Sequence, residues 1–161
     1  TVLRQYVDEV KKGYDYVLLD CRPSLGMLVI NALSASDYVL IPVQAEYFAA
    51  ENMTELVNTV QSIKRQINPK LKIGGVFMTM ANETNFRKDI VASVKAAYGK
   101  HLPIMQTIVP ATVRLAEIST ADHSIFVHEP KGRAAGAYRT LVKEVMEIGE
   151  KQRSKASDLS R

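Results

Sequence analysis

The sequence predicts an α/β fold, with a doubly wound, mostly parallel sheet that carries helices on both faces. Continuous apolar runs of strand length alternate along the chain with longer segments of helical periodicity. The runs are apolar at successive positions, which is typical of parallel strands covered on both sides. Glycine, proline and asparagine separate the segments, so the alternation indicates repeated βαβ units.

The first elements set this pattern. Apolar residues recur at helical spacing from Val2 to Val10, and this helix closes near Gly13. The apolar run at residues 16–20 predicts a buried strand. Ser24 can then cap a helix through about Ala35, because its hydroxyl can accept hydrogen bonds from the free N–H groups of the first turn.

The same alternation continues to the end of the chain. We expect strands at 38–43, 73–80, 104–108 and 124–127, and helices at 49–67, 85–98, 113–121 and 133–151. The chain has 161 residues, of which 47% are hydrophobic and 24% charged. This composition fits one α/β domain over residues 1–150, followed by a basic polar tail at 151–161.

Cysteine content and hydropathy indicate the setting. Cys21 is the only cysteine, so no disulfide can form within the chain, and a reducing, cytoplasmic setting is expected. We interpret Cys21 as a small buried residue, because no partner base for a nucleophile is identifiable. No apolar run of the sequence approaches the roughly 20 residues that span a bilayer. The net charge of +4 permits contact with nucleic acid without requiring it.

Asp20 is the first candidate for chemistry. It is the carboxylate that ends the apolar run at 16–20, and ligands of open parallel sheets bind at the carboxyl ends of the strands. Position alone leaves two interpretations open, a ligand-binding carboxylate and a cap for the following turn. His101, His123 and His128 lack the spacing of a metal site, and we interpret them as surface residues.

Several ordered blocks then carry a family resemblance. The blocks are 20–26 (DCRPSLG), 42–49 (PVQAEYFA), 75–80, 109–117 and 129–138. From about Tyr14 to Ile148 the chain resembles the ParA/Soj-type deviant-Walker partitioning ATPases of the ParA/MinD superfamily. The resemblance implies part of a P-loop NTPase fold.

The resemblance also implies roles for individual residues. Asp20 matches the family acid that supports a bound magnesium ion through water. Thr79, Met80 and Pro110 match the walls of the adenine pocket, although strand-end packing and a loop bend would also explain Thr79 and Pro110. Other matches are Pro23, Ser24 and Gly26 in the loop that senses the γ-phosphate, and Arg133 in DNA binding. No catalytic residue is assigned.

The sequence departs from the family in several places. Arg22 stands where the family usually has proline, the stretch 81–85 is one residue shorter than the family's turn, and Ala111 replaces an arginine that many relatives use on DNA. The sequence contains no G-x-x-x-x-G-K-[ST] phosphate-binding loop, which in the family lies near the N-terminus. We therefore expect a C-terminal part of a longer ATPase that does not hydrolyse ATP alone.

The function implied for the intact protein is a switch that requires ATP and Mg²⁺. This switch would form a homodimer, bind DNA nonspecifically and respond to a ParB-like partner. Through these steps it would partition plasmid or chromosomal DNA. The departures keep a second hypothesis open, a degenerate and noncatalytic ParA-like module for dimerisation or interaction. A membrane-bound relative that positions the division site fits less well, because residues 151–161 are too poor in apolar side chains for a membrane helix.

Overall fold

The structure is a computed structural model of the chain that describes residues 1–22, 26–44, 49–81, 85–118 and 123–158. The chain forms two compact units. The first unit consists of residues 1–40 and 50–73, and the second consists of residues 41–49 and 74–161. The single domain over residues 1–150 stays a prediction.

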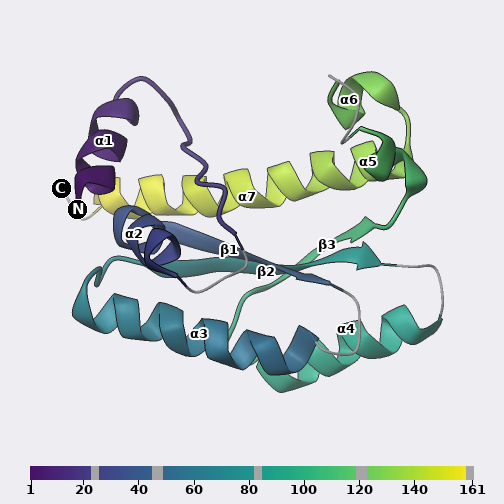
Figure 1. Cartoon of the computed structure of the whole chain (residues 1–161), viewed down its shortest axis with the longest axis horizontal. Helices are drawn as coiled ribbons and strands as arrows, with labels where there is room; N and C mark the ends of the chain where they lie inside the picture. Colours follow the sequence, from purple (N-terminus) through teal and green to yellow (C-terminus); the bar gives the residue numbers. More distant parts are fainter. Residues whose placement is uncertain (23–25, 45–48, 82–84, 119–122, 159–161) are drawn as a thin grey trace. The chain divides into compact units, whose positions relative to one another are not determined.

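A three-stranded sheet confirms the predicted α/β class (Figure 1). Its strands are β1 (Tyr38–Gln44), β2 (Lys72–Ala81) and β3 (Ile104–Pro110), in the order β1-β2-β3. β2 and β3 run parallel. The crossover helices are α3 (Ala49–Gln66), between β1 and β2, and α4 (Asn85–Tyr98), between β2 and β3. These five elements match the expected ranges to within two residues at each end.

In the first unit, helix α1 (Val2–Val10) packs against α2 (Met27–Ala35). Asn68, which follows α3, is buried and donates from its amide to the carbonyl oxygens of Leu33 at 3.0 Å and Ser36 at 2.7 Å. These bonds satisfy two carbonyls at the C-terminal end of α2 that have no partner within the helix. The apolar core of this unit comprises Val29, Leu33, Val60, Ile63 and Leu71.

In the second unit, the long helix α7 (Arg133–Asp158) packs along β3, and α4 lies on the opposite side of the β2–β3 pair (Figure 1). The pair is therefore covered on both faces, as the fold class predicts. Two short helices, α5 (Val113–Glu117) and α6 (Ile125–His128), precede α7. A small core joins them to its first turns, and it contains Ile125, Ala134 and Ala135 with Leu115, Ile118 and Tyr138 around them.

The expected strand at residues 16–20 is wrong. This segment is extended, but within the described part of the chain it pairs with no strand. Tyr16 is 40% exposed and Leu18 is 82% exposed, and Cys21 is exposed where we expected a buried residue. A strand needs a neighbour for its backbone N–H and C=O groups, so an apolar run alone does not define one.

The helices of the second unit differ from expectation in their bounds. Residues 124–127 do not form the expected strand, because the N–H groups of Val127 and His128 both donate to the carbonyl oxygen of Ser124 at 2.9 Å and start α6. Such local bonds need no neighbouring strand. α5 ends before the expected residue 121, and α7 continues to Asp158, past the expected end near residue 151. No helix in the described ranges has the length and apolarity that crossing a membrane would require.

Candidate functional site

The carboxyl ends of β2 and β3 bring together the residues predicted to contact a nucleotide base. Ala81 at the end of β2 is in register with Pro110 at the end of β3. The N–H of Ala111 donates to the carbonyl oxygen of Ala81 at 3.2 Å and joins the two ends. Thr79 and Met80 directly precede Ala81, so all three predicted residues lie at one edge of the sheet.

Met80 has an unusual backbone conformation at this edge. Its φ of 53° lies in the left-handed region, which residues other than glycine rarely adopt. Between the register pairs Met78–Ile108 and Ala81–Pro110, β2 holds one residue more than β3, so Met80 lies in a β-bulge. A conformation of this kind costs roughly 1–3 kcal/mol and is found mainly at binding and switch regions.

The side chains at these strand ends differ in exposure. Met80 is 52% exposed, whereas Thr79 is half-buried and Pro110 is buried. The Met80 thioether is flexible and apolar, so it can cover a planar ring, and the Thr79 hydroxyl can donate or accept beside it. This donor set fits a nucleotide base. Sequence reasoning missed the left-handed residue, since neither glycine nor asparagine signals it there.

Asp20 lies in the first unit, at the end of the extended segment 16–20. Its carboxylate is exposed, as are its neighbours Cys21 and Arg22. The Cys21 thiol donates to the carbonyl oxygen of Leu19 at 3.6 Å. Mg²⁺ takes oxygen ligands and usually keeps several waters, so one exposed carboxylate fits one position around it. Among the described residues, no three His, Cys, Asp or Glu side chains gather to form a site from protein ligands alone.

Gly26 is the N-cap of α2. Pro23 and Ser24 lie outside the described residues, and so does the cap expected from Ser24. The carbonyl oxygen of Gly26 accepts from the N–H groups of Val29 at 3.0 Å and Ile30 at 3.2 Å. Its backbone is extended, and a Cβ there would meet no atom of the described residues within 4 Å. The local fold therefore does not require glycine, although glycine leaves room for a ligand at the first turn.

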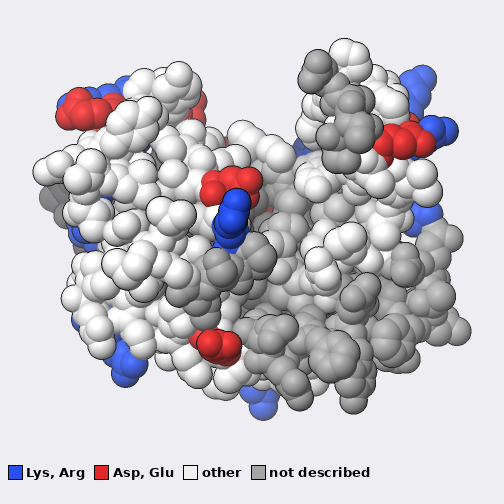
Figure 2. All heavy atoms as spheres, viewed as in Figure 1, with Lys and Arg blue, Asp and Glu red and all other residues white. Residues whose placement is uncertain are grey.

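Arg133, the predicted DNA-binding residue, is exposed at the start of α7. Arg139 donates to the carbonyl oxygen of Pro130 at 2.7 Å, and its guanidinium lies 5.2 Å from the centre of the Phe126 ring. Arg139 therefore holds the junction of α6 and α7. Figure 2 shows Lys and Arg side chains scattered over the described surface of the visible face, several beside acidic ones, without a continuous basic patch there.

Glu117 connects α5 to α6. Its Oε2 accepts from Arg114 Nη1 at 2.9 Å and lies 3.3 Å from His128 Nε2. The hydrogen bonds with Arg114 and then His128 lower the pKa of Glu117 below its ordinary value, and the Arg114–Glu117 contact raises the pKa of Arg114. His101, His123 and His128 are all exposed, which confirms their interpretation as surface residues.

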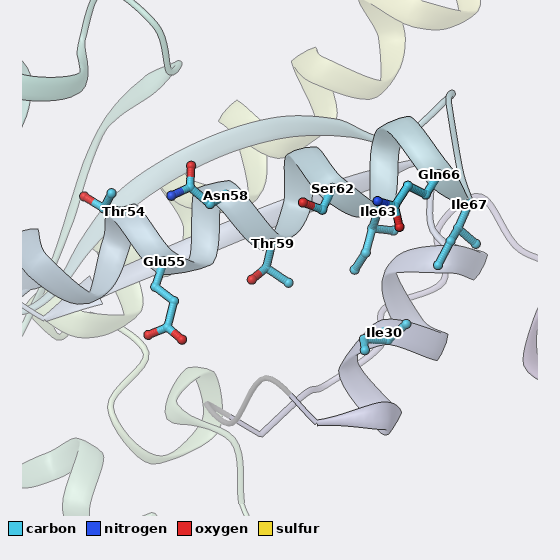
Figure 3. Close-up of a pocket in the computed structure, with 9 residues that line it drawn as sticks. All are labelled: Ile30, Thr54, Glu55, Asn58, Thr59, Ser62, Ile63, Gln66 and Ile67. Carbon is cyan, nitrogen blue, oxygen red and sulfur yellow. The ribbon is translucent and has the colours of Figure 1, made fainter.

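The first unit also has a shallow hollow of about 610 Å³ along α3 (Figure 3). One end of it is apolar, where Ile30 of α2 lies near Ile63 and Ile67, and the rest is a polar stripe of α3. None of the predicted metal-, nucleotide- or DNA-binding residues that the structure describes lines this hollow. The polar lining residues are Thr54, Glu55, Asn58, Thr59, Ser62 and Gln66.

The chain matches a family model described as an AAA domain over residues 1–73. It is 40% identical over 148 residues to the sporulation initiation inhibitor protein Soj of Bacillus subtilis. The aligned region covers 91% of this chain and 58% of that protein. It is 37% identical to the chromosome partitioning protein ParA of Myxococcus xanthus, over 89% of this chain and 50% of the relative. The chromosome-partitioning ATPase Soj of Thermus thermophilus is 39% identical, over 91% of this chain and 57% of that protein. The chain therefore spans 50–58% of the length of these relatives.

Solved structures support the fold. The chain is similar to cobyrinic acid a,c-diamide synthase from Mycobacterium smegmatis, with a TM-score of 0.69 and 28% identity over 85% of this chain and 49% of that one. The form of that enzyme with bound ADP and magnesium gives the same TM-score and identity, over 85% of this chain and 48% of the enzyme chain. The similarity confirms the α/β class for most of the chain.

Proposed function

The chain belongs to the ParA/Soj-type proteins of the ParA/MinD superfamily, and from this we propose that it is part of an ATPase that partitions DNA. The observation that carries the proposal is identity of 37–40% over about nine-tenths of the chain to the three relatives named above. Similarity of this extent covers both compact units and every block that carries the resemblance.

In the proposed function, the intact protein binds ATP and Mg²⁺, forms a homodimer, binds DNA nonspecifically and responds to a ParB-like partner. Magnesium, when bound, would neutralise charge on the phosphates. The exposed carboxylate of Asp20 would orient a water on the metal. The strand ends would hold the base through Thr79, Met80 and Pro110.

The remaining residues would couple nucleotide to DNA. Gly26 starts α2 without a side chain, which leaves its first N–H groups accessible to a γ-phosphate, and Pro23 and Ser24 would complete that loop. Arg133 would contact a DNA phosphate. Because one phosphate contact contributes modestly, DNA binding would depend on both protomers of a dimer and would weaken strongly with salt.

The proposal is tested by inheritance of DNA in the organism that encodes the protein. Deleting the gene should raise the loss rate of one replicon, and the wild-type gene should restore it. The Asp20→Ala variant should fail to restore inheritance, while Asp37→Asn, which changes another exposed carboxylate of the first unit, should succeed. Normal inheritance after deletion would contradict the partitioning role.

A second candidate function is the noncatalytic interaction module. Arg22 and Ala111, which depart from the family, are both exposed and so could change the site without harm to the fold. For the deletion strain that carries Asp20→Ala, this alternative predicts the opposite result. The variant gene would restore inheritance as well as the wild-type gene does.

A further inference from the structure

β3 lies at one edge of the described sheet, since the strand order is β1-β2-β3. Its sequence, IMQTIVP, has no charged residue and is rich in β-branched side chains. In general, an edge strand of this composition is a template for pairing with another chain, because unpaired backbone groups and uncharged side chains offer nothing repulsive.

The edge strand is irregular in its middle. β3 advances four residues, from Ile104 to Ile108, while β2 advances only two, from Val76 to Met78. The extra residues form a bulge that leaves some N–H groups of β3 without a partner in β2. Unpaired N–H groups next to a buried residue are costly, and Thr107 in this stretch is buried.

A single carboxylate from α7 occupies these groups. Glu144 accepts from the N–H of Gln106 at 2.9 Å and from the N–H of Thr107 at 2.8 Å, and the Thr107 hydroxyl also donates to it. Glu144 is half-buried, and α7 runs along β3 (Figure 1). Three donors of the bulge therefore bond to one acidic side chain, which places a carboxylate against the edge strand.

We propose that Glu144 keeps the β3 edge closed to a second copy of this chain. Two copies related by a two-fold axis would present the same uncharged edge to each other, and their β3 strands could pair antiparallel. The Glu144 carboxylate prevents this in two ways. It occupies the donors that a partner strand would use, and pairing would bring two such carboxylates together at the new junction.

The proposal makes a different prediction from a plain tether between helix and strand. If Glu144 only fastens α7 to β3, its removal frees the two amides but leaves the chain in its original state of association. If Glu144 guards the edge, its removal frees the amides and also allows association through β3.

The test compares Glu144→Ala and Glu144→Gln with Glu147→Ala, an exposed glutamate on the same helix, in the full chain. All measurements are made without nucleotide and with EDTA, so that ATP-dependent dimerisation of the proposed function is excluded. Hydrogen exchange follows the Gln106 and Thr107 amides, and light scattering on a sizing column gives the mass over a concentration series.

We expect exchange of both amides to rise about tenfold or more in dilute Glu144→Ala, with a mass that doubles as concentration increases and amides that become protected again in the dimer. Glu147→Ala should match the wild type. Glu144→Gln keeps one carbonyl acceptor but removes the charge, so it should associate only at a higher concentration than Glu144→Ala. If the alanine variant unfolds, Glu144→Gln still tests the proposal. Faster exchange with unchanged mass in both variants would overturn the proposal, as would unchanged exchange.

Discussion

Residues 16–20 and strand β3 are both short apolar runs, yet they are used differently. The first is extended, belongs to no strand of the described sheet, and is exposed at Tyr16 and Leu18. β3 is paired with β2 on one edge, bonded to Glu144 through its bulge, and buried at Met105, Thr107 and Val109. The difference shows that apolar composition makes a segment able to form a strand, while neighbours that satisfy the backbone decide whether it does.

The two regions also differ in what they offer a ligand. The extended run ends in Asp20, which is exposed and is the residue that we propose for the metal. β3 ends in buried Pro110, beside the left-handed Met80. We therefore expect the stability of the chain to depend on β3 more than on residues 16–20. We expect function to depend on the residues at the ends of both segments.

The largest expected effect separates the two regions by stability. Met105→Ala removes a side chain of β3 that is 7% exposed and should lower the free energy of unfolding by about 2–5 kcal/mol. Leu18→Ala removes one that is 82% exposed and should change it by less than about 0.5 kcal/mol. Urea denaturation of the two variants measures both. A large loss from Leu18→Ala would show that the run at 16–20 is packed after all.

The next effect concerns metal. If the proposed function holds, Asp20→Ala in the intact protein should raise the Mg²⁺ concentration needed for half-maximal ATP hydrolysis about 10–100-fold, because the carboxylate would orient one water ligand of the ion. Asp37→Asn should leave the Mg²⁺ dependence unchanged. Stability should hardly change in either variant, since both carboxylates are exposed. An unaltered Mg²⁺ titration for Asp20→Ala would remove it from the metal site.

Two glycines sharpen the comparison further. Gly26→Ala should raise the free energy of unfolding by about 0.4–1 kcal/mol, because the backbone there suits any residue and no atom obstructs a Cβ. The same change should impair the nucleotide response if the first turn of α2 faces a phosphate.

Gly75→Ala, beside β3, should lower the free energy of unfolding by about 1–3 kcal/mol, since its Cβ would lie 2.5 Å from Met105 Sδ. Thermal melts and ATP-dependent dimerisation give the two readouts.

The smallest effect is a dependence on pH in the second unit. The pKa of Glu117 is lowered by its hydrogen bonds with Arg114 and His128. Its contribution to stability is therefore present above the pKa of the unfolded chain and is lost as pH falls through the lower folded pKa. Glu117→Gln should lower the melting temperature slightly near pH 6 and not at about pH 3. An equal difference at both pH values would mean that the charge of Glu117 is irrelevant.

Much of the fold could be predicted from the sequence, because β1, α3, β2, α4 and β3 form a regular alternation in which period and flanking turn residues agree. The pattern failed at residues 16–20 and at α6. In the first case the segment is not part of the described sheet, although its composition suits a strand. In the second, a four-residue run is too short for its periodicity to distinguish a turn of helix from a strand.

The candidate site was predictable only in part. The family resemblance predicts roles for Asp20, Gly26, Thr79, Met80 and Pro110, and these roles stay predictions. The register of β2 and β3 brings Met80 and Pro110 to the same end of the sheet. The left-handed backbone of Met80 and the role of Glu144 were not predictable, because each depends on a bulge whose position only strand pairing reveals. Pro23 and Ser24 lie outside the described residues, so their place in the site stays a prediction.

The contact between Glu144 and β3 also fixes a length. Ala134 is anchored in the core beneath α6, and Glu144 meets the bulge of β3 ten residues further on, about 15 Å along the helix axis. One residue inserted between them would turn the carboxylate by roughly 100° away from its donors. The number of residues between Ala134 and Glu144 is therefore fixed by two contacts at once, and an insertion between them should break one of the two.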